Sequence, residues 1–164
     1  MHPAALTTDA LMAQCASRRQ RRGGPGGQHR NKVETAVVLT HEPTGVAAEA
    51  NERRSQAENL RVAQFRLRVA LALQVRTSPP AERSELWRGR LRGSRIAVNP
   101  EHDDFPSLLA EALDVLAAED WDDAVAAERM GVSRTQLVRL LKHGPAALAL
   151  LNGARTERGQ PPLR

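Results

Sequence analysis

The chain has 164 residues, of which 41% are apolar and 2% aromatic, and it carries a formal net charge of +5. This length fits one ordinary domain or two very small ones, and the single cysteine, Cys15, excludes a disulfide framework or a cysteine cluster for a metal. No apolar run approaches the roughly 20 residues that span a bilayer, and the N-terminus lacks the apolar core of a secretory signal. We therefore expect a cytoplasmic protein without a membrane partner.

The basic charge is concentrated in the first part of the chain. Residues 1–100 hold 17 Lys and Arg against 8 Asp and Glu, whereas residues 101–164 hold 7 against 11. Nearly all of these cations are arginines, whose planar fork of donors suits phosphate oxygens. This distribution indicates a nucleic acid or phosphate partner for the first part and not for the second.

The elements of the first part are predicted from local patterns. Residues 3–16 predict a short helix that leads into an edge strand, and a glycine-rich loop follows. Residues 33–41, VETAVVLTH, are rich in β-branched side chains and predict a strand. Residues 42–45, EPTG, predict a type I turn with Pro second and Gly fourth, and residues 46–50 predict the return strand of a hairpin.

A long helix is predicted next. Ser55 and Glu58 fit a capping box, and the helix is expected to end at about Val75. The side chains expected to face the sheet recur at helical spacing, and they are Leu60, Ala63, Leu67 and Leu71. Arginines seven residues apart line another side, either as a solvated face or as a track for backbone phosphates: Arg54, Arg61 and Arg68.

The second part changes in composition. Residues 77–100 are rich in Pro, Gly and Arg, which indicates a basic linker. Residues 101–128 contain ten acidic residues and no Lys or Arg. The remaining pattern predicts four helices, over residues 105–118, 122–130, 133–143 and 145 to about 151.

Residues 127–137, AERMGVSRTQL, resemble a helix-turn-helix core. Gly131 makes the turn, and Ser133 caps the second helix with Gln136 at the box position. The inner face is expected at Leu137, Leu140 and Leu141, and the outer face at Arg134, Gln136, Arg139 and Lys142. A DNA reader, an RNA or ribosome contact and a purely structural or protein-docking bundle all stay open, although the acidic flank repels DNA phosphates.

Together these elements predict an α+β chain. Residues 1–76 are expected to form a small α/β domain, a β-hairpin with a packed helix. Residues 77–100 are expected to be the basic linker, and residues 101–164 an all-α domain with the helix-turn-helix-like core.

The glycine-rich segment over residues 21–32, RRGGPGGQHRNK, has neither common phosphate-loop spacing. It lacks the Lys-Ser or Lys-Thr of a P-loop, and a strand rather than a helix is predicted after it. What remains is a loop that can bring its backbone very close to a partner and that carries Gln28. A carboxamide donates and accepts without titrating, which favours positioning of water or stabilisation of an oxyanion over acid–base chemistry.

Residues 23–37, GGPGGQHRNKVETAV, resemble the GGQ loop of class I peptide chain release factors, and the likeness extends over roughly residues 10–75, through LTHEPTG and ERRSQ. The resemblance implies hydrolysis of peptidyl-tRNA in the peptidyl transferase centre of the ribosome. It implies that Gly26 and Gly27 supply the backbone conformation. Gln28 is implied to orient the attacking water and to stabilise charge on oxygen through its backbone N–H. Ribosomal RNA supplies the rest, so no cofactor or metal is implied.

The resemblance also implies the partners. These are large-subunit ribosomal RNA, peptidyl-tRNA and a glutamine methyltransferase that modifies Gln28, with the protein acting as a monomer. Release factors usually carry Val where Arg30 stands, so Arg30 is either an added phosphate contact or a solvated side chain. Asn31 and Thr35 are expected to support the loop. The residues expected to contact RNA are Arg18, Arg19, Arg21, Arg22, His29, Arg30, Lys32, Arg54, Arg61 and Arg68.

Only about twenty residues precede the loop, whereas full release factors have a long N-terminal part that reads stop codons. The chain therefore resembles the stand-alone, codon-independent members that rescue stalled ribosomes. One kind of rescue factor has a long Lys/Arg-rich tail, which residues 152–164 match poorly, with three arginines and one glutamate. The alternatives are a non-catalytic ribosome- or RNA-binding adaptor and a DNA-binding regulator that uses the helix-turn-helix.

Overall fold

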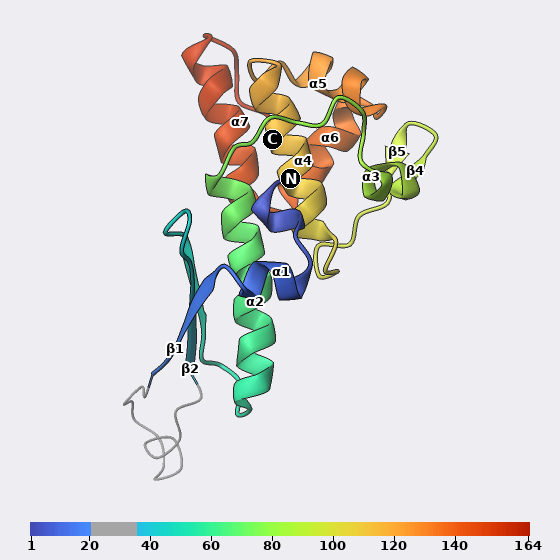
Figure 1. The fold of residues 1–164 in the computed structure, drawn as a ribbon. Helices are drawn as coiled ribbons and strands as arrows, with labels where there is room; N and C mark the ends of the chain where they lie inside the picture. Colours follow the sequence, from blue (N-terminus) through green and yellow to red (C-terminus); the bar gives the residue numbers. More distant parts are fainter. Residues whose placement is uncertain (21–35) are drawn as a thin grey trace. The chain divides into compact units, whose positions relative to one another are not determined.

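The computed structural model describes residues 1–20 and 36–164, which form two compact units (Figure 1). The first unit holds residues 3–74 and the second residues 75–164. Helices and small antiparallel sheets are combined, which agrees with the predicted α+β class. No helix within the described residues is long and apolar enough to cross a membrane.

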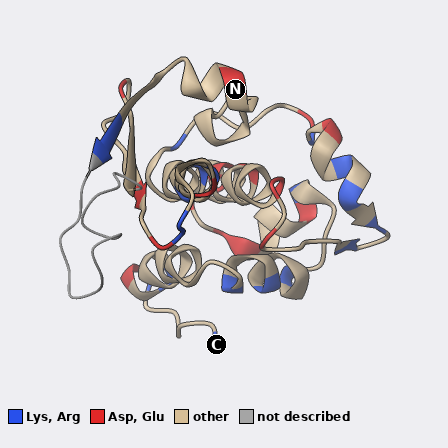
Figure 2. Ribbon diagram, turned by 90° about the horizontal axis from the view of Figure 1, so that it is seen from below, with Lys and Arg blue, Asp and Glu red and all other residues tan. Residues whose placement is uncertain are grey.

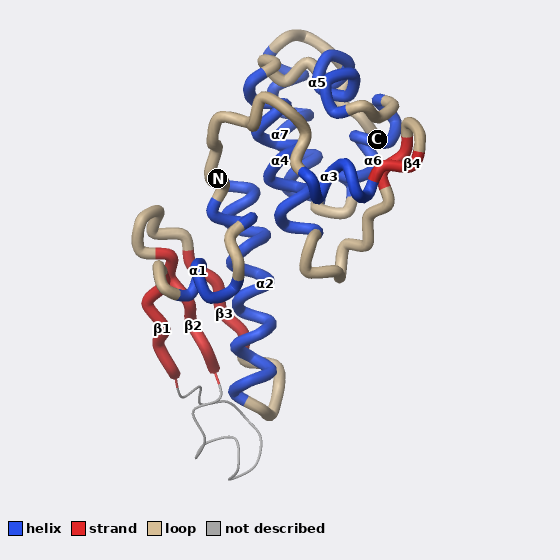
Figure 3. Tube along the Cα trace, turned by 45° about the vertical axis from the view of Figure 1, so that its right-hand side comes forward, coloured by secondary structure: helices blue, strands red, loops and turns tan. Residues whose placement is uncertain are grey.

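The first unit is a three-stranded antiparallel sheet with a long helix packed against it (Figure 3). The strand order is β1-β2-β3, with β1 at an edge, and α2 packs against β2 and β3. The short helix, edge strand, hairpin and long helix predicted here are confirmed. In chain order the elements are η1 (Pro3–Ala5), α1 (Thr8–Met12), β1 (Cys15–Gln20), β2 (Ala36–His41), β3 (Ala47–Ala50) and α2 (Gln56–Gln74).

The core of this unit is formed by apolar side chains of the sheet and of α2. Val37 and Leu39 are buried in β2, because alternate side chains of a strand point to the same face. Of the four α2 residues predicted to face the sheet, Leu60 is only partly buried. Asn59, which lies beside it, is fully buried instead. The other three are buried as predicted: Ala63, Leu67 and Leu71.

The turn between β2 and β3 begins one residue earlier than predicted. The backbone N–H groups of Thr44 and Gly45 both donate to the His41 carbonyl, at 3.2 and 2.8 Å, and the His41 N–H donates to the Val46 carbonyl at 2.8 Å. Gly45 has a φ of +72°, a left-handed conformation that a β-carbon disfavours. The glycine is therefore required for its backbone conformation rather than as the fourth residue of a type I turn.

The second unit contains a small hairpin and five helices among its described residues. The α4 helix begins and ends at the predicted residues, and α5 and α6 lie within one residue of their predicted ends. The last helix, α7, runs well past Leu151. In chain order the elements are α3 (Glu85–Arg90), β4 (Leu91–Arg92), β5 (Arg95–Ile96), α4 (Phe105–Ala118), α5 (Asp123–Met130), α6 (Arg134–Lys142) and α7 (Pro145–Glu157).

Residues 77–100 are packed structure, so the prediction of a linker is wrong for them. They contain α3, β4 and β5, and Trp87 is 0% exposed. The Trp87 indole N–H donates to the Met130 carbonyl at 2.9 Å. The Ser84 hydroxyl accepts from the Trp87 backbone N–H at 3.0 Å and donates to the Glu111 carboxylate at 2.5 Å. Side-chain burial and a helix cap therefore hold this Arg-rich stretch against the helices.

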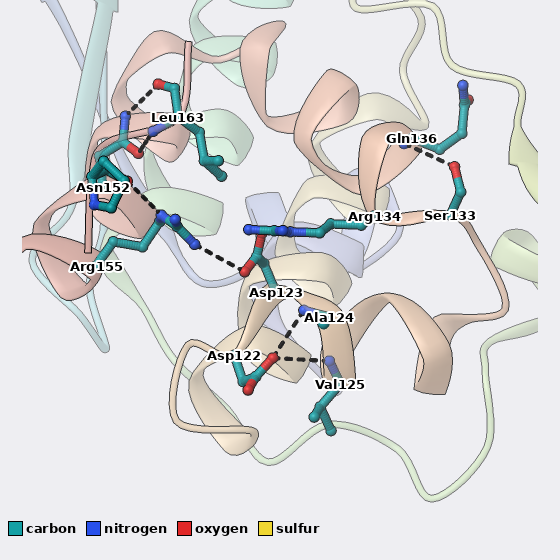
Figure 4. Close-up of polar contacts among 11 residues, drawn as sticks. Asp122, Asp123, Ala124, Val125, Ser133, Arg134, Gln136, Asn152, Arg155 and Leu163 are labelled. Atoms are coloured by element: carbon teal, nitrogen blue, oxygen red, sulfur yellow. Dashed lines mark hydrogen bonds and ion pairs between the residues drawn. The ribbon is translucent and has the colours of Figure 1, made fainter. Parts of the chain in front are cut away.

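The C-terminal residues fold back along α7 instead of forming a free basic tail (Figure 4). The Asn152 amide donates to the Leu163 carbonyl at 3.0 Å and accepts from the Leu163 N–H at 2.7 Å. Arg155 is only 7% exposed, and its Nε donates to the Pro161 carbonyl at 3.0 Å. Its Nη1 lies 3.2 Å from Oδ1 of Asp123, so one of the tail's three cations forms a buried ion pair within the unit.

Candidate functional site

The glycine-rich loop connects two paired strands of the sheet. β1 and β2 are antiparallel neighbours, and Gln20 lies opposite Ala36. Both ends of residues 21–35 are therefore held at the same end of the sheet (Figure 1). The predicted site and support residues that fall in this connection lie outside the described residues, and they are Arg21, Arg22, Gly26, Gly27, Gln28, His29, Arg30, Asn31, Lys32 and Thr35.

A buried histidine fixes the opposite end of these strands. One nitrogen of the His41 ring, Nε2, lies 3.0 Å from Oε1 of Gln14, and Nδ1 lies 2.7 Å from the Thr44 hydroxyl. Because an amide oxygen only accepts, Nε2 is the donor, and Nδ1 accepts from the hydroxyl in the neutral ring. The Gln14 carbonyl also accepts from the Glu42 N–H at 2.9 Å. These bonds tie the start of β1 to the β2–β3 turn and so hold the register that positions the loop.

Arg18 and Arg19 lie on opposite faces of β1, directly before the loop. Residues that face each other across paired strands share one side of the sheet. Arg19 lies opposite Val37, which is buried, whereas Arg18 lies opposite Val38. Both arginines are exposed. Each face of β1 therefore carries one exposed arginine close to the point where the loop begins.

The three arginines that were predicted to line one side of the long helix lie in different environments. Arg54 is exposed in the bend before α2, and Arg61 is exposed within α2. Arg68 is partly buried, and its Nη2 donates to the Leu6 carbonyl at 2.6 Å. Arg68 therefore supports the packing of the N-terminal segment, whereas Arg54 and Arg61 stay as candidate contacts for RNA.

The sheet register brings Arg54 to the loop end of the first unit. Val37 lies opposite Ala50, which is the last residue of β3. Val37 is also the second residue of β2, directly after Ala36, where the chain re-enters the sheet. Residues 51–55 leave the sheet at this end, and α2 then runs back along it (Figure 1). At a rise of about 1.5 Å per residue, Arg68 lies about 10 Å further along α2 than Arg61.

A buried side chain that the sequence analysis missed holds the segment before α2. Asn59 is 0% exposed, its Oδ1 accepts from the Arg53 N–H at 2.9 Å, and its Nδ2 donates to the Arg53 carbonyl at 3.0 Å. Both polar groups of the amide are thus used on the residue next to Arg54. An Asn in the first turn of a helix is ordinarily an exposed polar residue, so its sequence pattern did not predict this contact.

Asn59→Ala is expected to lower the free energy of unfolding by about 1–3 kcal/mol, because the Arg53 N–H and carbonyl lose their partners. Urea denaturation measures the change. Glu58→Gln, at the exposed neighbouring position, is the control and is expected to stay within about 0.5 kcal/mol of the wild type. Equal unfolding midpoints for the two variants would show that the two hydrogen bonds between Asn59 and Arg53, the Asn59 clamp, contribute nothing to stability.

An exposed ion pair connects the same segment to α2. Nη2 of Arg66 lies 2.6 Å from Oε1 of Glu52, and Nη1 donates to the Glu49 carbonyl at 2.9 Å. The backbone N–H groups of Glu52 and Asn51 hold the pKa of the Glu52 carboxyl below its usual value, and the Arg66 guanidinium adds to this effect.

We expect the Glu52 carboxyl to titrate below the usual range of glutamate in an NMR titration. Arg66→Met is expected to raise that pKa only in part, because the backbone donors contribute more than Arg66. A carboxyl whose pKa is lowered on folding stabilises the fold above its usual pKa, and this contribution is lost as the pH falls through the lowered value. A full return to the usual pKa in Arg66→Met would contradict the dominant role of the backbone.

The helix-turn-helix-like core is present in the second unit. Gly131 ends α5 with a φ of +67°, and the Ser133 hydroxyl accepts from the Gln136 N–H at 3.3 Å (Figure 4). Arg134 is exposed, as predicted for the outer face, but it is also ion-paired, because its Nε donates to the buried Asp123 carboxylate at 2.5 Å. The three predicted inner residues are buried, namely Leu137, Leu140 and Leu141, and the other exposed cations of α6 are Arg139 and Lys142.

The loop sequence and the sheet that holds its ends define a release-factor-like chain, and comparison with known proteins identifies the family. Residues 9–97 match the family model described as the RF-1 domain. The chain belongs to this family of peptide chain release factor-like proteins. The match includes the first unit from α1 onward and α3, β4 and β5 of the second unit, and it leaves α4 to α7 outside.

Relatives of three kinds show the same likeness. The chain is 38% identical over 90 residues to an uncharacterized mitochondrial peptide chain release factor-like protein of Saccharomyces cerevisiae, which covers 54% of this chain and 58% of that protein. It is 34% identical over 129 residues to peptide chain release factor 1 of Frankia casuarinae, covering 66% and 36%. It is 57% identical over 51 residues to the chloroplastic peptide chain release factor PrfB1 of Arabidopsis thaliana, covering 31% and 11%. The chain thus spans less than two thirds of the length of each of these relatives.

Proposed function

We propose that this protein hydrolyses the ester of peptidyl-tRNA on the ribosome without reading a stop codon, and that it thereby releases peptides from stalled ribosomes. The observation that carries the proposal is the pairing of Gln20 with Ala36, which holds both ends of the loop with Gly26, Gly27 and Gln28 at one end of a packed sheet. Membership of the RF-1 domain family and the likeness to named release factors support this reaction.

In the proposed reaction, water attacks the carbonyl carbon of the ester that joins the peptide to the 3′ oxygen of tRNA. The bond from that carbon to the 3′ oxygen breaks, which leaves a peptide carboxylate and a tRNA with a free 3′ hydroxyl. The Gln28 carboxamide orients the water, and the Gln28 backbone N–H donates to the carbonyl oxygen as it gains charge. A positioned donor of this kind contributes about 10²–10³ in rate. Ribosomal RNA supplies the remaining groups.

A loop that enters an RNA cavity needs a rigid base and positively charged side chains around that base. The β1–β2 pairing, the His41 hydrogen bonds and the Asn59 clamp provide the base. Arg18 and Arg19 lie at its edge. Because such contacts release counterions from RNA phosphates, binding to ribosomes is expected to weaken as salt rises.

We further propose that the protein acts as a monomer. A monomer binds the large-subunit ribosomal RNA and the peptidyl-tRNA, and Gln28 accepts one methyl group from a glutamine methyltransferase. The intact mass of the protein purified from its own host would show that added methyl group.

Codon independence is the part of the proposal that a release assay separates from hydrolysis itself. The test uses ribosomes that carry labelled peptidyl-tRNA with a stop codon, a sense codon or no codon in the A site. We expect release without a stop codon at a rate comparable to that with one. A strict need for a stop codon would overturn codon independence, and binding without release on any complex would favour a non-catalytic adaptor.

A further inference from the structure

A basic groove of about 530 Å³ lies within the second unit, between the β4–β5 hairpin and α6. Its cations are Arg92 and Arg95 from the hairpin and Arg139 from α6, with Gln136 and His143 beside them. None of the described residues that line the groove is acidic. In Figure 2 all Lys and Arg of the described residues are blue, and Asp and Glu are red.

Backbone contacts fix the two walls of the groove to each other. The Ser133 N–H, at the start of α6, donates to the Ser94 carbonyl in the hairpin turn at 3.0 Å. The Ala97 N–H donates to the Arg90 carbonyl at 2.9 Å, and Ile96 is buried beneath the hairpin. The exposed guanidinium groups of the hairpin are therefore presented from a fixed edge.

The cations at the two ends of α6 differ in their partners. In helix-turn-helix readers, residues at the N-terminal end of the second helix contact the base edges. Here Arg134 at that end is bound to Asp123. Two further exposed cations, Arg139 and Lys142, lie in the C-terminal half of α6. This arrangement suits contacts to phosphates, which position a nucleic acid without reading its sequence.

We propose that this groove binds the phosphodiester backbone of RNA, as a second contact separate from the glycine-rich loop. Guanidinium forks pair with phosphate oxygens, and the acid-free groove complements a polyanion. RNA is favoured over DNA because Arg134, at the base-reading end of α6, is ion-paired with the Asp123 carboxylate. In addition, the β4–β5 hairpin lies inside the segment that matches the release factor family. The identification of this RNA as ribosomal rests on the proposed function. Binding of RNA by the groove does not require that the protein hydrolyses peptidyl-tRNA.

The first test compares the affinity of two full-length double variants for an RNA hairpin of mixed sequence. Arg95→Gln with Arg139→Gln alters the groove, and Arg158→Gln with Arg164→Gln removes the same charge at exposed positions outside it. Loss of two charge-assisted contacts is expected to weaken binding about tenfold or more and to reduce the salt slope by about 1.5. The control variant is expected to bind nearly as the wild type, and both are expected to melt as the wild type does.

A second test locates the RNA directly. The chain has two lysines, Lys32 in the glycine-rich loop and Lys142 on α6, next to the groove residue His143. An amine-reactive reagent therefore reports on the loop and on the groove as separate positions. The RNA hairpin is expected to protect Lys142, and the groove variant is expected to lose that protection.

Three results would overturn the proposal. The first is equal reactivity of Lys142 with and without RNA, and the second is an equal loss of affinity in the groove and control variants. The third is tighter binding of a DNA duplex of the same sequence with Lys142 protected, which would assign the groove to DNA. Peptide release at saturating protein is measured separately. Loss of RNA binding by the groove is thereby distinguished from loss of hydrolysis by the loop.

Discussion

Gln28→Ala and Gly27→Ala are each expected to lower single-turnover peptide release by about 10²-fold or more, the effect of misplaced reacting groups, while leaving ribosome binding nearly unchanged. Alanine at position 28 removes the carboxamide that we propose orients water. Alanine at position 27 adds a β-carbon where, in the proposed reaction, the backbone approaches the ester closely, and it restricts the conformations open to the chain. Release from ribosomes saturated with each variant measures the effect on the chemical step.

Matched variants elsewhere in the chain separate this effect from a general one. Gly153→Ala places a β-carbon in open space within α7, and Gln160→Ala removes an exposed carboxamide near the C-terminus. Both are expected to release peptide at the wild-type rate. If Gln28→Ala lost ribosome affinity in proportion to its release rate, the residue would act in binding and not in the reaction.

Trp87→Ala is expected to lower the free energy of unfolding of the second unit by about 3–5 kcal/mol. The side chain is fully buried, and its loss leaves a cavity and an unpaired Met130 carbonyl. Since small domains are stable by about 5–15 kcal/mol, this is a large fraction of the total. Chemical denaturation followed by circular dichroism measures the change.

Trp87→Phe is the matched control, because it keeps an aromatic ring and removes the indole N–H. We expect it to cost about 1–3 kcal/mol, mainly through the lost partner of the Met130 carbonyl. A change below about 0.5 kcal/mol in Trp87→Ala, the size typical of surface positions, would restore the interpretation of residues 77–100 as a linker.

Elements with strong local patterns were predictable. The α4 helix is built largely of leucines and alanines at helical spacing, and its predicted and observed ends coincide at Phe105 and Ala118. In α5 and α6, Gly131 and Ser133 mark a helix end and a helix start by their own backbone preferences. Such positions depend on neighbours in the sequence, so the sequence alone specifies them.

Features that depend on distant partners were not predictable. The many arginines, prolines and glycines of residues 77–100 outweighed Trp87, whose burial depends on Met130 far along the chain. In the same way, α7 continues past Leu151, and Arg155 in this last part of the helix pairs with Asp123, which is distant in the sequence. At the candidate site, the loop residues stay a prediction from their own motif, whereas Asn59 could be found only from its contact with Arg53.

The central claim is tested most directly by single-turnover release on ribosomes that carry labelled peptidyl-tRNA and no stop codon. At saturating protein, the wild type is expected to free the labelled peptide and leave a deacylated tRNA, with a rate at least about 10² times that of Gln28→Ala. An intact ester after full occupancy of the ribosomes by the wild-type protein would contradict the proposed hydrolysis.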